Sequence, residues 1–362
     1  MLDVKDGVYR ANFKGIFMIR RLFISITLAL ALSVNALAGE YEQIVLGGFS
    51  PDGSKLLLNY CKKVGCTFGY FNFVDSRFVP IIPKDKDQHW GAGSFSADGK
   101  KIAVSIKRQS EYGRYAQLGI VDLKTMNIVE LTKIPALRQA PSFSHDGKKL
   151  IYVQANRERQ SGMTRFSDWD VYEIDLKTGN EKKLTNYSFF SANVPTYLPD
   201  DKQFIFSAEA PSEFGGVKGS DARKAYEKQY GDNTIFIRND TETPLSPLFV
   251  KRRSSGTPNI SRDGTRIVYV GDVEKEDGIK TRYAYDLFLF EKGAHKRITQ
   301  LQSYILSVSL SWDGQNVVFV TDSPEGIFKN IRNYQLWQLN IKTGAVNQLH
   351  HIEDAQFSIV KH

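Results

Sequence analysis

The chain of 362 residues carries a formal net charge of +8, and its 24% of charged residues is an ordinary fraction for a protein. Residues 1–38 hold five basic and two acidic side chains, so residues 39–362 carry +5, scattered along the chain rather than gathered in one block. This mild basic excess suits anionic partners such as acidic glycans or lipid head groups. No stretch alternates basic and aromatic residues as nucleic-acid-binding proteins do, so we expect no nucleic-acid partner.

The N-terminal region has the parts of a secretory signal peptide. Arg20 and Arg21 precede the apolar run 22–34, LFISITLALALSV, and the small-residue sequence 36–38 follows it. A basic start, a short apolar core and an A-x-A site are typical of such a peptide, and the run is too short to span a bilayer. We expect residues 1–38 to be an upstream extension plus signal peptide, with the true start at Met18. The mature protein, 39–362, is then periplasmic or secreted and has no transmembrane segment.

A short pattern recurs along residues 39–362: an apolar residue, then Ser-x-Asp-Gly, then an apolar run. Its copies begin at Phe49, Phe95, Phe143, Tyr197, Ile260 and Leu310. In such a turn the Ser and Asp oxygens bond backbone N–H groups, and Gly takes the left-handed position of a three-residue hairpin loop. The copy at Tyr197 is worn, with Asp201 in place of Gly. We interpret the repeated Asp residues as turn formers rather than as metal ligands or catalytic groups.

A second hairpin follows each turn, seen best in 170–185, DVYEIDLKTGNEKKLT, and also in 118–132, 285–299 and 334–349. The repeats begin 46 to 63 residues apart, a period typical of solenoids and propellers. Two hairpins give four antiparallel strands, and four-stranded units repeated radially make a β-propeller. The predicted fold is therefore all-β, a single six-bladed β-propeller of four-stranded antiparallel blades over 39–362.

The F-S-x-D-G turn followed by a DVYEIDLKTG…LT hairpin resembles the repeat of TolB-like propellers, also called the WD40-like PD40 repeat. The resemblance covers nearly all of 39–362. It implies a periplasmic or secreted propeller that binds proteins or small ligands. The chain departs from TolB because no α/β domain pattern precedes Phe49. The Tol–Pal role is therefore not carried over to this chain.

Cys61 and Cys66 are the two cysteines of the sequence, in the segment YCKKVGCTF. They flank a four-residue loop between the expected second and third strands of the first blade. In an oxidising compartment a disulfide is the leading interpretation, with two free thiols as the alternative. A zinc site would lack ligands because no His lies nearby.

Sequence motifs give little support for catalysis. The chain has neither G-x-S-x-G nor H-E-x-x-H, and the glycine-rich stretch 91–96 falls on an expected strand with no helix after it. His145 occupies the variable turn position, where we expect it to be exposed. Propeller lyases that degrade pectate resemble this general fold and use a His-bound metal. The enzyme alternative is thus a metal-assisted glycan lyase or hydrolase with a divalent ion near His89, His350 and His351; the leading interpretation has no catalytic residue and no cofactor.

The connections between second and third strands are long, at 107–117, 155–169, 209–232, 271–284 and 322–333, whereas the turns at the opposite ends of the strands are minimal. We call these two sides the long-loop face and the short-turn face. Connections of such length are usually functional or disordered. They are rich in Arg and Tyr, which anchor interfaces. The candidate binding residues are Arg108, Arg114, Tyr115, Arg157, Arg165, Arg223, Arg282, Tyr283 and Arg332.

Two further expectations concern helix and closure. Residues 220–231 are expected to add a short helix to the longest connection, with Ser220 as its cap. Residues 355–358 repeat the start of the turn unit, so we expect the two chain ends to meet in one blade and hide strand edges. The sequence predicts a protein or cell-envelope component as the partner. It leaves the partner's identity and the oligomeric state open.

Overall fold

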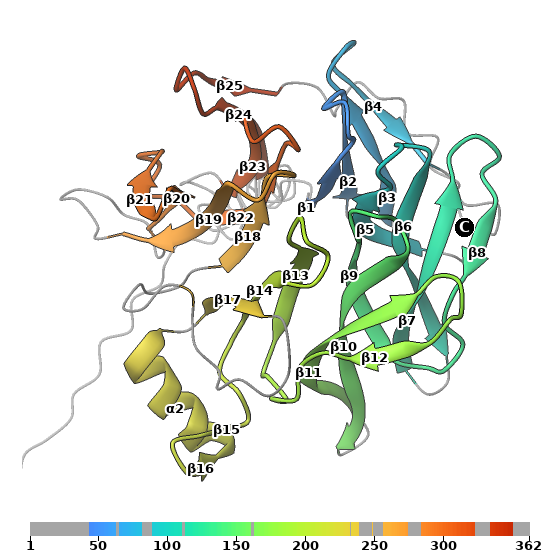
Figure 1. Cartoon of the computed structure of the whole chain (residues 1–362), viewed down its shortest axis with the longest axis vertical. Coiled ribbons are helices and arrows are strands. Elements are labelled where there is room, and N and C mark those ends of the chain that lie inside the picture. The colour runs from blue at the N-terminus through green and yellow to red at the C-terminus, as the bar shows by residue number, and fades with distance from the viewer. Residues whose placement is uncertain are drawn as a thin grey trace, which may run out of the picture. The chain divides into compact units, whose positions relative to one another are not determined.

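The computed structural model describes residues 43–62, 65–81, 89–110, 113–160, 163–231, 233–238, 248, 256–273, 284–322 and 334–349. All of them belong to the unit Tyr41–His362. The expected signal peptide and the start at Met18 lie outside the described residues. The described chain is a mostly-β propeller with four-stranded antiparallel blades (Figure 1). Within it, no helix combines the length and apolarity needed to cross a membrane.

Three sheets consist of four strands that are consecutive in the sequence, and every neighbouring pair in them is antiparallel. The first sheet holds β1 (Gln43–Phe49), β2 (Lys55–Lys62), β3 (Gly65–Asn72) and β4 (Arg77–Pro80). The second holds β18 (Gly256–Ile260), β19 (Arg266–Asp272), β20 (Tyr285–Glu291) and β21 (Ala294–Arg297). The third holds β22 (Ile305–Leu310), β23 (Asn316–Asp322), β24 (Tyr334–Asn340) and β25 (Val346–Gln348).

A sheet of eight strands contains two such groups. The first group is β5 (His89–Phe95), β6 (Lys101–Ser110), β7 (Gly113–Asp122) and β8 (Ile128–Glu130). The second is β9 (Leu137–Phe143), β10 (Lys149–Gln160), β11 (Met163–Asp175) and β12 (Glu181–Lys183). One parallel pair, Ala116 opposite Leu137, joins the groups. Because that link is a single pair, each group keeps the four-stranded antiparallel form of the other sheets.

The remaining strands form a three-stranded sheet with an insertion. The sheet contains β13 (Ala192–Tyr197), β14 (Phe204–Ala208) and β17 (Thr234–Arg238). Between β14 and β17 the chain makes a small hairpin and a helix: β15 (Glu213–Phe214), β16 (Val217–Lys218) and α2 (Gly219–Tyr230). Residues 239–247 lie outside the described residues, and beyond them the Leu248 amide donates to the Ile235 carbonyl of β17 over 2.7 Å. We name each group of strands by its first member, from the β1 unit to the β22 unit.

The first strands pack against one another in chain order. β1 contacts β5, β5 contacts β9, β9 contacts β13, β13 contacts β18 and β18 contacts β22. β22 in turn contacts β1. Each of these strands carries a bulge or register irregularity against its second strand. Bulges increase the local twist of a strand. The contacts among the first strands thus run through all the units and return from the last unit to the first.

The Ser-x-Asp-Gly turns have the chemistry expected from the sequence. Ser50 Oγ donates to Asp52 Oδ1 over 2.6 Å, and the Ser54 amide donates to the same oxygen over 3.0 Å. Gly53 has φ +71°, a left-handed conformation that suits glycine. In the worn copy Asp201 takes that conformation with φ +52°. The prediction that the repeated Asp residues form turns is confirmed.

A Thr preceded by Leu or Ile follows the fourth strand of three units, at 132, 185 and 299, and it has a physical role. Thr185 Oγ1 accepts from the Val171 amide and donates to the buried Asp170 carboxylate. Thr299 repeats this arrangement with the Leu287 amide and the buried Asp286. The same Asp oxygens also accept amide hydrogens from the link to the next unit, such as that of Leu301. The Thr–Asp pair therefore fastens the fourth strand to the third and starts the link.

The first and last units meet through an apolar interface. One cluster of buried side chains contains Ile44, Leu46 and Phe49 of β1 together with Val318 and Val320 of β23. The Leu46 amide also donates to Ser307 Oγ over 3.1 Å. Among the described strands each of the two sheets is built from its own consecutive strands. Residues 355–358 lie outside the described residues, so the predicted meeting of the chain ends in one blade stays a prediction.

Candidate functional site

The long-loop face differs from its expected form in two places. Residues 107–117 and 155–169 were expected to be loops, but most of each segment is paired strand. β6 and β7 stay in register to Ser110 opposite Gly113, and β10 and β11 pair to Gln160 opposite Met163 after one register shift between Gln154 and Asn156. The reason is that antiparallel pairing, once in register, continues as long as both backbones stay extended. Two long hairpins therefore extend from this face.

The ladder places several of the candidate binding residues opposite defined partners. Arg108 lies opposite Tyr115, and Arg114 lies opposite Gln109. On the second hairpin Arg157 lies opposite Phe166, and Arg165 lies opposite Glu158. These pairings put cationic and aromatic positions side by side on each hairpin, because directly opposed residues share one face of a strand pair.

Not all candidate positions can be placed to the same extent. Tyr115 is half-buried. The side chains of Arg108, Arg114, Arg157 and Arg165 lie outside the described part of the chain. Three further candidates lie outside it entirely: Arg282, Tyr283 and Arg332. For these seven positions, and equally for Tyr115 and Arg223, the binding role stays a prediction.

The third insertion contains the expected helix but not the expected cap. α2 covers Gly219–Tyr230, close to the predicted 220–231. Its N-cap is Lys218, in an extended conformation and without a side-chain cap bond. The prediction of Ser220 as the cap is therefore wrong. Gly219 and Gly215, both with positive φ, bend the chain so early that Ser220 falls inside the first turn of the helix.

Aromatic packing holds this insertion on the β13 unit. The ring of Phe214 packs edge-on against Tyr226 and Tyr230, with centroids 5.1 and 5.9 Å away. Tyr226 is buried, and its hydroxyl bonds Thr234 Oγ1 on β17 over 2.6 Å. Burial raises the pKa of this tyrosine, so the phenol stays neutral. The helix is thus fixed to the sheet by both apolar and polar contacts.

Arg223 has a positioning role in this insertion. Its guanidinium pairs with Glu209 at 3.0 Å and with Glu227 at 2.5 Å, and it lies over the ring of Phe190 with its central carbon 5.3 Å from the centroid. Two carboxylates already neutralise the charge, and one of them lies outside the helix. The side chain therefore ties α2 to the end of β14.

The short-turn face is cross-linked between units, contrary to expectation for His145. This residue is half-buried. Its Nδ1 lies 3.0 Å from Asp201 Oδ1, and its amide donates to the same carboxylate oxygen over 2.6 Å. The Asp146 amide donates to the other oxygen over 2.9 Å. The expectation that His145 is exposed is wrong, because Asp201 of the β13 unit reaches across to the turn of the β9 unit.

The cross-link continues to the β18 and β22 units. Arg262 Nη2 donates to the His145 carbonyl over 2.8 Å, and its guanidinium carbon lies 4.6 Å from the centroid of the Trp312 ring. The Arg262 amide donates to the Trp312 carbonyl over 2.9 Å. We call His145, Asp201, Arg262 and Trp312 the clasp. It joins the turns of four units on this face.

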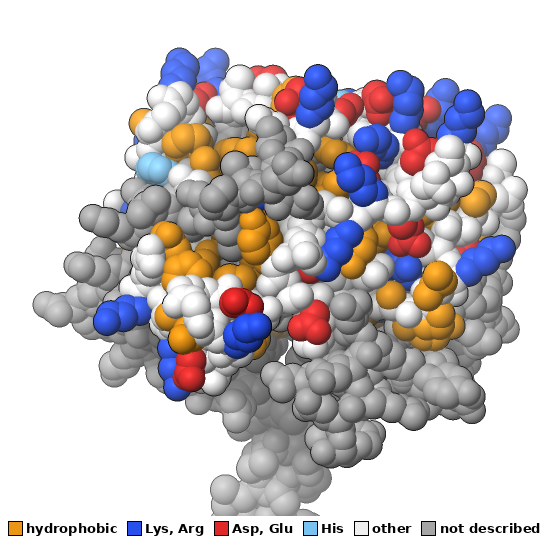
Figure 2. Space-filling view, turned by 60° about the horizontal axis from the view of Figure 1, so that its bottom comes forward, with side chains coloured by type: hydrophobic (Ala, Val, Ile, Leu, Met, Phe, Trp, Pro, Cys, Tyr) orange, Lys and Arg blue, Asp and Glu red, His pale blue; other side chains and the backbone are white. Residues whose placement is uncertain are grey.

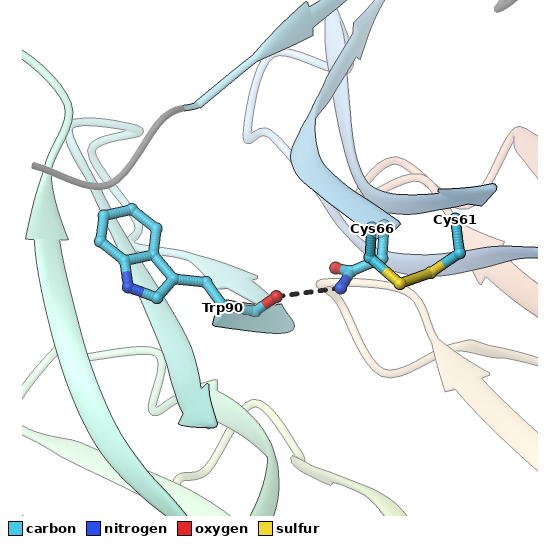
Figure 3. The surroundings of a disulfide bond; sticks show 4 residues. Cys61, Cys66 and Trp90 are labelled. Atoms are coloured by element: carbon cyan, nitrogen blue, oxygen red, sulfur yellow. Dashed lines mark hydrogen bonds between the residues drawn. A yellow bond between two sulfur atoms is a disulfide. The ribbon is translucent and has the colours of Figure 1, made fainter. Parts of the chain in front are cut away.

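The two cysteines form the predicted disulfide (Figure 3). Cys61 and Cys66 are directly opposed on β2 and β3, with Cα atoms 3.9 Å apart. Beside them Asn59 Nδ2 donates to the Trp90 carbonyl over 2.9 Å, linking this hairpin to the start of β5. The bridge lies at the long-loop end of the β1 unit.

The side chains of the three histidines predicted for the metal alternative are not among those that the structure describes. His350 and His351 lie outside the described residues, and His89 starts β5 with its side chain outside them. Within the described ranges, no group of three or more His, Cys, Asp or Glu side chains is arranged to hold a metal ion.

The surface in view in Figure 2 has mixed charge, with Lys and Arg interspersed with Asp and Glu and hydrophobic side chains between them. Such mixing of charges on the surface in view favours short-range contacts with a partner over long-range attraction by charge of one sign.

Comparisons with known proteins agree on the fold. No family model matches the chain, and no curated protein does. Among solved structures, TolB from Acinetobacter baumannii is similar with a TM-score of 0.52 and 21% identity, over 84% of this chain and 62% of that one. An oligogalacturonate lyase in complex with manganese matches with a TM-score of 0.52 and 16% identity, over 84% and 78%. An acylaminoacyl peptidase matches with 0.51 and 14%, over 85% and 52%.

These similarities establish a β-propeller shared by proteins of different activity. The chain spans about three fifths of the length of the TolB structure. At such low identities the similarity concerns the fold alone, and the TolB-like repeat noted in the sequence is matched at that level.

Proposed function

We propose that the protein is an exported propeller scaffold that binds a protein or cell-envelope component through its long-loop face. One observation carries the proposal: the contrast between the two faces. The turns of the short-turn face bond to one another through the clasp. The other face projects two paired hairpins and a helical insertion beyond what the sheets need. Extensions on a rigid scaffold are where binding residues gather.

We further propose that the propeller has six blades. The support is the circuit of contacts among β1, β5, β9, β13, β18 and β22, which returns to its start. In the β13 unit the Leu248 amide donates to the Ile235 carbonyl of β17 over 2.7 Å. Leu184, Ile298 and Leu349 make the same bond to the third strand just after the fourth strands of other units, which supports a blade at this place too.

We propose periplasmic localisation on the basis of the signal-peptide pattern at 22–38 and the disulfide. Both fit an oxidising compartment reached by export. N-terminal sequencing of the secreted product should give Gly39 as the first residue. A mature chain that keeps residue 1 would contradict the proposal.

The proposed surface suits a partner that presents carboxylates and apolar groups. In the backbone ladders an Arg position lies opposite an aromatic position on each hairpin, Arg108 opposite Tyr115 and Arg157 opposite Phe166. Arg binds carboxylates through two parallel hydrogen bonds, and aromatic rings cover apolar groups. The partner is therefore expected to be a protein surface or an acidic envelope component.

The test shortens both hairpins at positions fixed by their register. Residues 108–115 are replaced by Asn-Gly after Lys107 and before Ala116, and 157–166 by Asn-Gly between Asn156 and Ser167; both pairs are opposed in the native ladders. Asn-Gly closes a two-residue hairpin. Binding partners from envelope extract are then compared between this variant and the wild type. We expect capture to be lost while the protein stays folded.

The matched control changes three exposed lysines of the short-turn face, Lys148, Lys182 and Lys342, to Ala. It should capture partners as the wild type does. If only the lysine variant loses capture, the partner binds the short-turn face, and the proposal is wrong. The enzyme alternative is tested on the same preparations: stoichiometric Mn, Ca or Zn together with cleavage of oligogalacturonate would replace the scaffold proposal.

A further inference from the structure

The disulfide between Cys61 and Cys66 lies where it adds little to the closure of the fold. The sequence separation is 5, and a bridge across so short a loop removes less conformational freedom from the unfolded chain than a long-range bridge. The hairpin is also closed without it, because β2 and β3 pair from Lys55–Asn72 to Lys62–Gly65. The ladder continues past the bridge to the tip. Stabilising the whole propeller is therefore not the main effect of this bond.

The two sulfur-bearing residues differ in access. Cys66 is exposed, whereas Cys61 is only 8% exposed. Thiol–disulfide exchange requires a thiolate to approach one sulfur along the bond, so access decides which sulfur is attacked. An exposed Cys66 can be reached in the folded protein. The sulfur of Cys61 is then the leaving group.

The bridge shares a sheet face with the contact to the next unit. Asn59 and Cys61 are two apart on β2, and Phe68 and Cys66 are two apart on β3, so all four side chains point to one side. On that side Asn59 Nδ2 donates to the Trp90 carbonyl (Figure 3). Phe68 packs edge-on against the Trp90 ring, with centroids 6.2 Å apart. Asn59 Oδ1 is buried and has no hydrogen-bond partner among the described residues. The hairpin tip is therefore next to a contact that is only partly satisfied.

We propose that Cys61–Cys66 is a site of thiol–disulfide exchange with a dithiol reductant, and that its reduction loosens the tip of the β2–β3 hairpin and its seating on Trp90 while the propeller stays folded. This inference does not rest on the proposed binding function. One thiolate of the dithiol attacks Cys66 Sγ, the S–S bond breaks, and Cys61 leaves as a thiolate. The second thiolate of the dithiol attacks its own sulfur in the mixed disulfide and releases the Cys66 thiolate.

The exchange balances without a further reactant. The protein disulfide gains two electrons, the dithiol becomes its own disulfide, and its two protons pass to the two cysteine thiolates. After reduction the pair Cys61–Cys66 is held by the backbone ladder alone. The freed segment is the end of a hairpin, the part of a strand pair that opens most readily.

The first test measures the rate of reduction of the folded protein by dithiothreitol, with alkylation and mass measurement of the free thiols. We expect a rate that rises in proportion to the dithiothreitol concentration, because the bond is reached without unfolding. A rate that levels off at the rate of global unfolding would overturn the proposal.

The second test is hydrogen exchange on the oxidised protein, the reduced protein and the Cys61→Ser/Cys66→Ser variant. Peptides covering 56–72 and 89–95 should exchange at least about tenfold faster in the last two samples, as local opening predicts. Peptides covering the β19–β20 hairpin, 266–291, are the internal control and should not change. Equal exchange in all three samples would overturn the proposal, and so would a serine variant that fails to fold.

Discussion

The two faces of this propeller obtain their order in different ways. On the short-turn face, turns from different units bond to one another: the carboxylate of Asp201 receives the amides of His145 and Asp146. On the long-loop face, each extension is ordered by contacts within its own unit, as when Tyr226 of α2 bonds Thr234. Substitutions in the clasp should therefore affect stability, and substitutions toward the tips of the two long hairpins should affect what the protein binds.

The largest loss of stability is expected at the point where the chain leaves a fourth strand and begins the link to the next unit. Asp286 is fully buried and accepts from Thr299 Oγ1, from the Leu301 amide and from Arg297 Nη2. Changing Asp286 to Ala leaves these donors without their acceptor and should lower the free energy of unfolding by about 3 kcal/mol. Urea denaturation measures the loss. Asp286→Asn, which keeps one acceptor oxygen, should lose less, and a loss under ~1 kcal/mol for the Ala variant would contradict this role.

The clasp should give the next largest effect. Changing Asp201 to Ala removes the acceptor for two backbone amides and for the His145 ring, and we expect a loss of about 1–2 kcal/mol because the carboxylate is partly exposed. Arg262→Ala should lose a similar amount by giving up the His145 carbonyl and the Trp312 ring. Lys202→Ala, an exposed neighbour, is the control. Partner capture should be unchanged in all three variants; a clasp variant that keeps its stability but loses capture would reverse the assignment of the faces.

A smaller effect of opposite sign is expected in the helical insertion. Lys218 is the N-cap of α2 but makes no side-chain cap bond. Changing Lys218 to Ser offers a hydroxyl to the amides of the second or third helical residue and should stabilise the insertion by about 0.5–1 kcal/mol. Its ion pair with Glu213 is exposed and contributes little. Glu213→Gln is the control for that pair, and thermal melting of both variants should show a gain only for the Ser variant.

The smallest effect is a pH dependence that arises on the short-turn face. Hydrogen bonds from Ser50 and Ser54 lower the pKa of Asp52 from 3.8 to about 2, and bonds from Lys148 and Ser144 lower that of Asp146 to about 2. Because the pKa is lower in the folded state, these carboxylates stabilise the fold above about pH 4, and the contribution is lost as the pH falls toward 2. The melting temperature should fall over that range. Asp52→Asn/Asp146→Asn should weaken the fall; an unchanged slope would contradict the turn chemistry.

The parts of the structure that depend on neighbouring residues could be predicted from the sequence. The Ser-x-Asp-Gly turns, the paired hairpins and the bridge between Cys61 and Cys66 each involve a few consecutive residues whose chemistry is local. The propeller followed from their repetition. The helix at 220–231 was predicted too, although its cap was not, because the glycines on either side of Lys218 decide where it begins.

Long-range contacts could not be predicted in this way. His145 and Asp201 are 56 residues apart, and His145 and Arg262 are 117 apart, so only the packing of the units brings them together. Arg223 was predicted to bind a partner because Arg in a long connection is typical of interfaces. Its pairing with Glu209, from the other end of the insertion, gives it a structural role that the sequence did not indicate, and its binding role stays a prediction.

The most direct test of the binding face is photo-crosslinking in cells that express the protein, with a photoreactive amino acid at one position at a time. On the long-loop face it replaces Tyr115 or Arg165, which lie on the two hairpins. On the short-turn face it replaces Lys148 or Lys342, both exposed. We expect a discrete crosslinked partner at Tyr115 or Arg165 and none at the lysines. Adducts confined to Lys148 or Lys342, or none at any of the four positions, would contradict it.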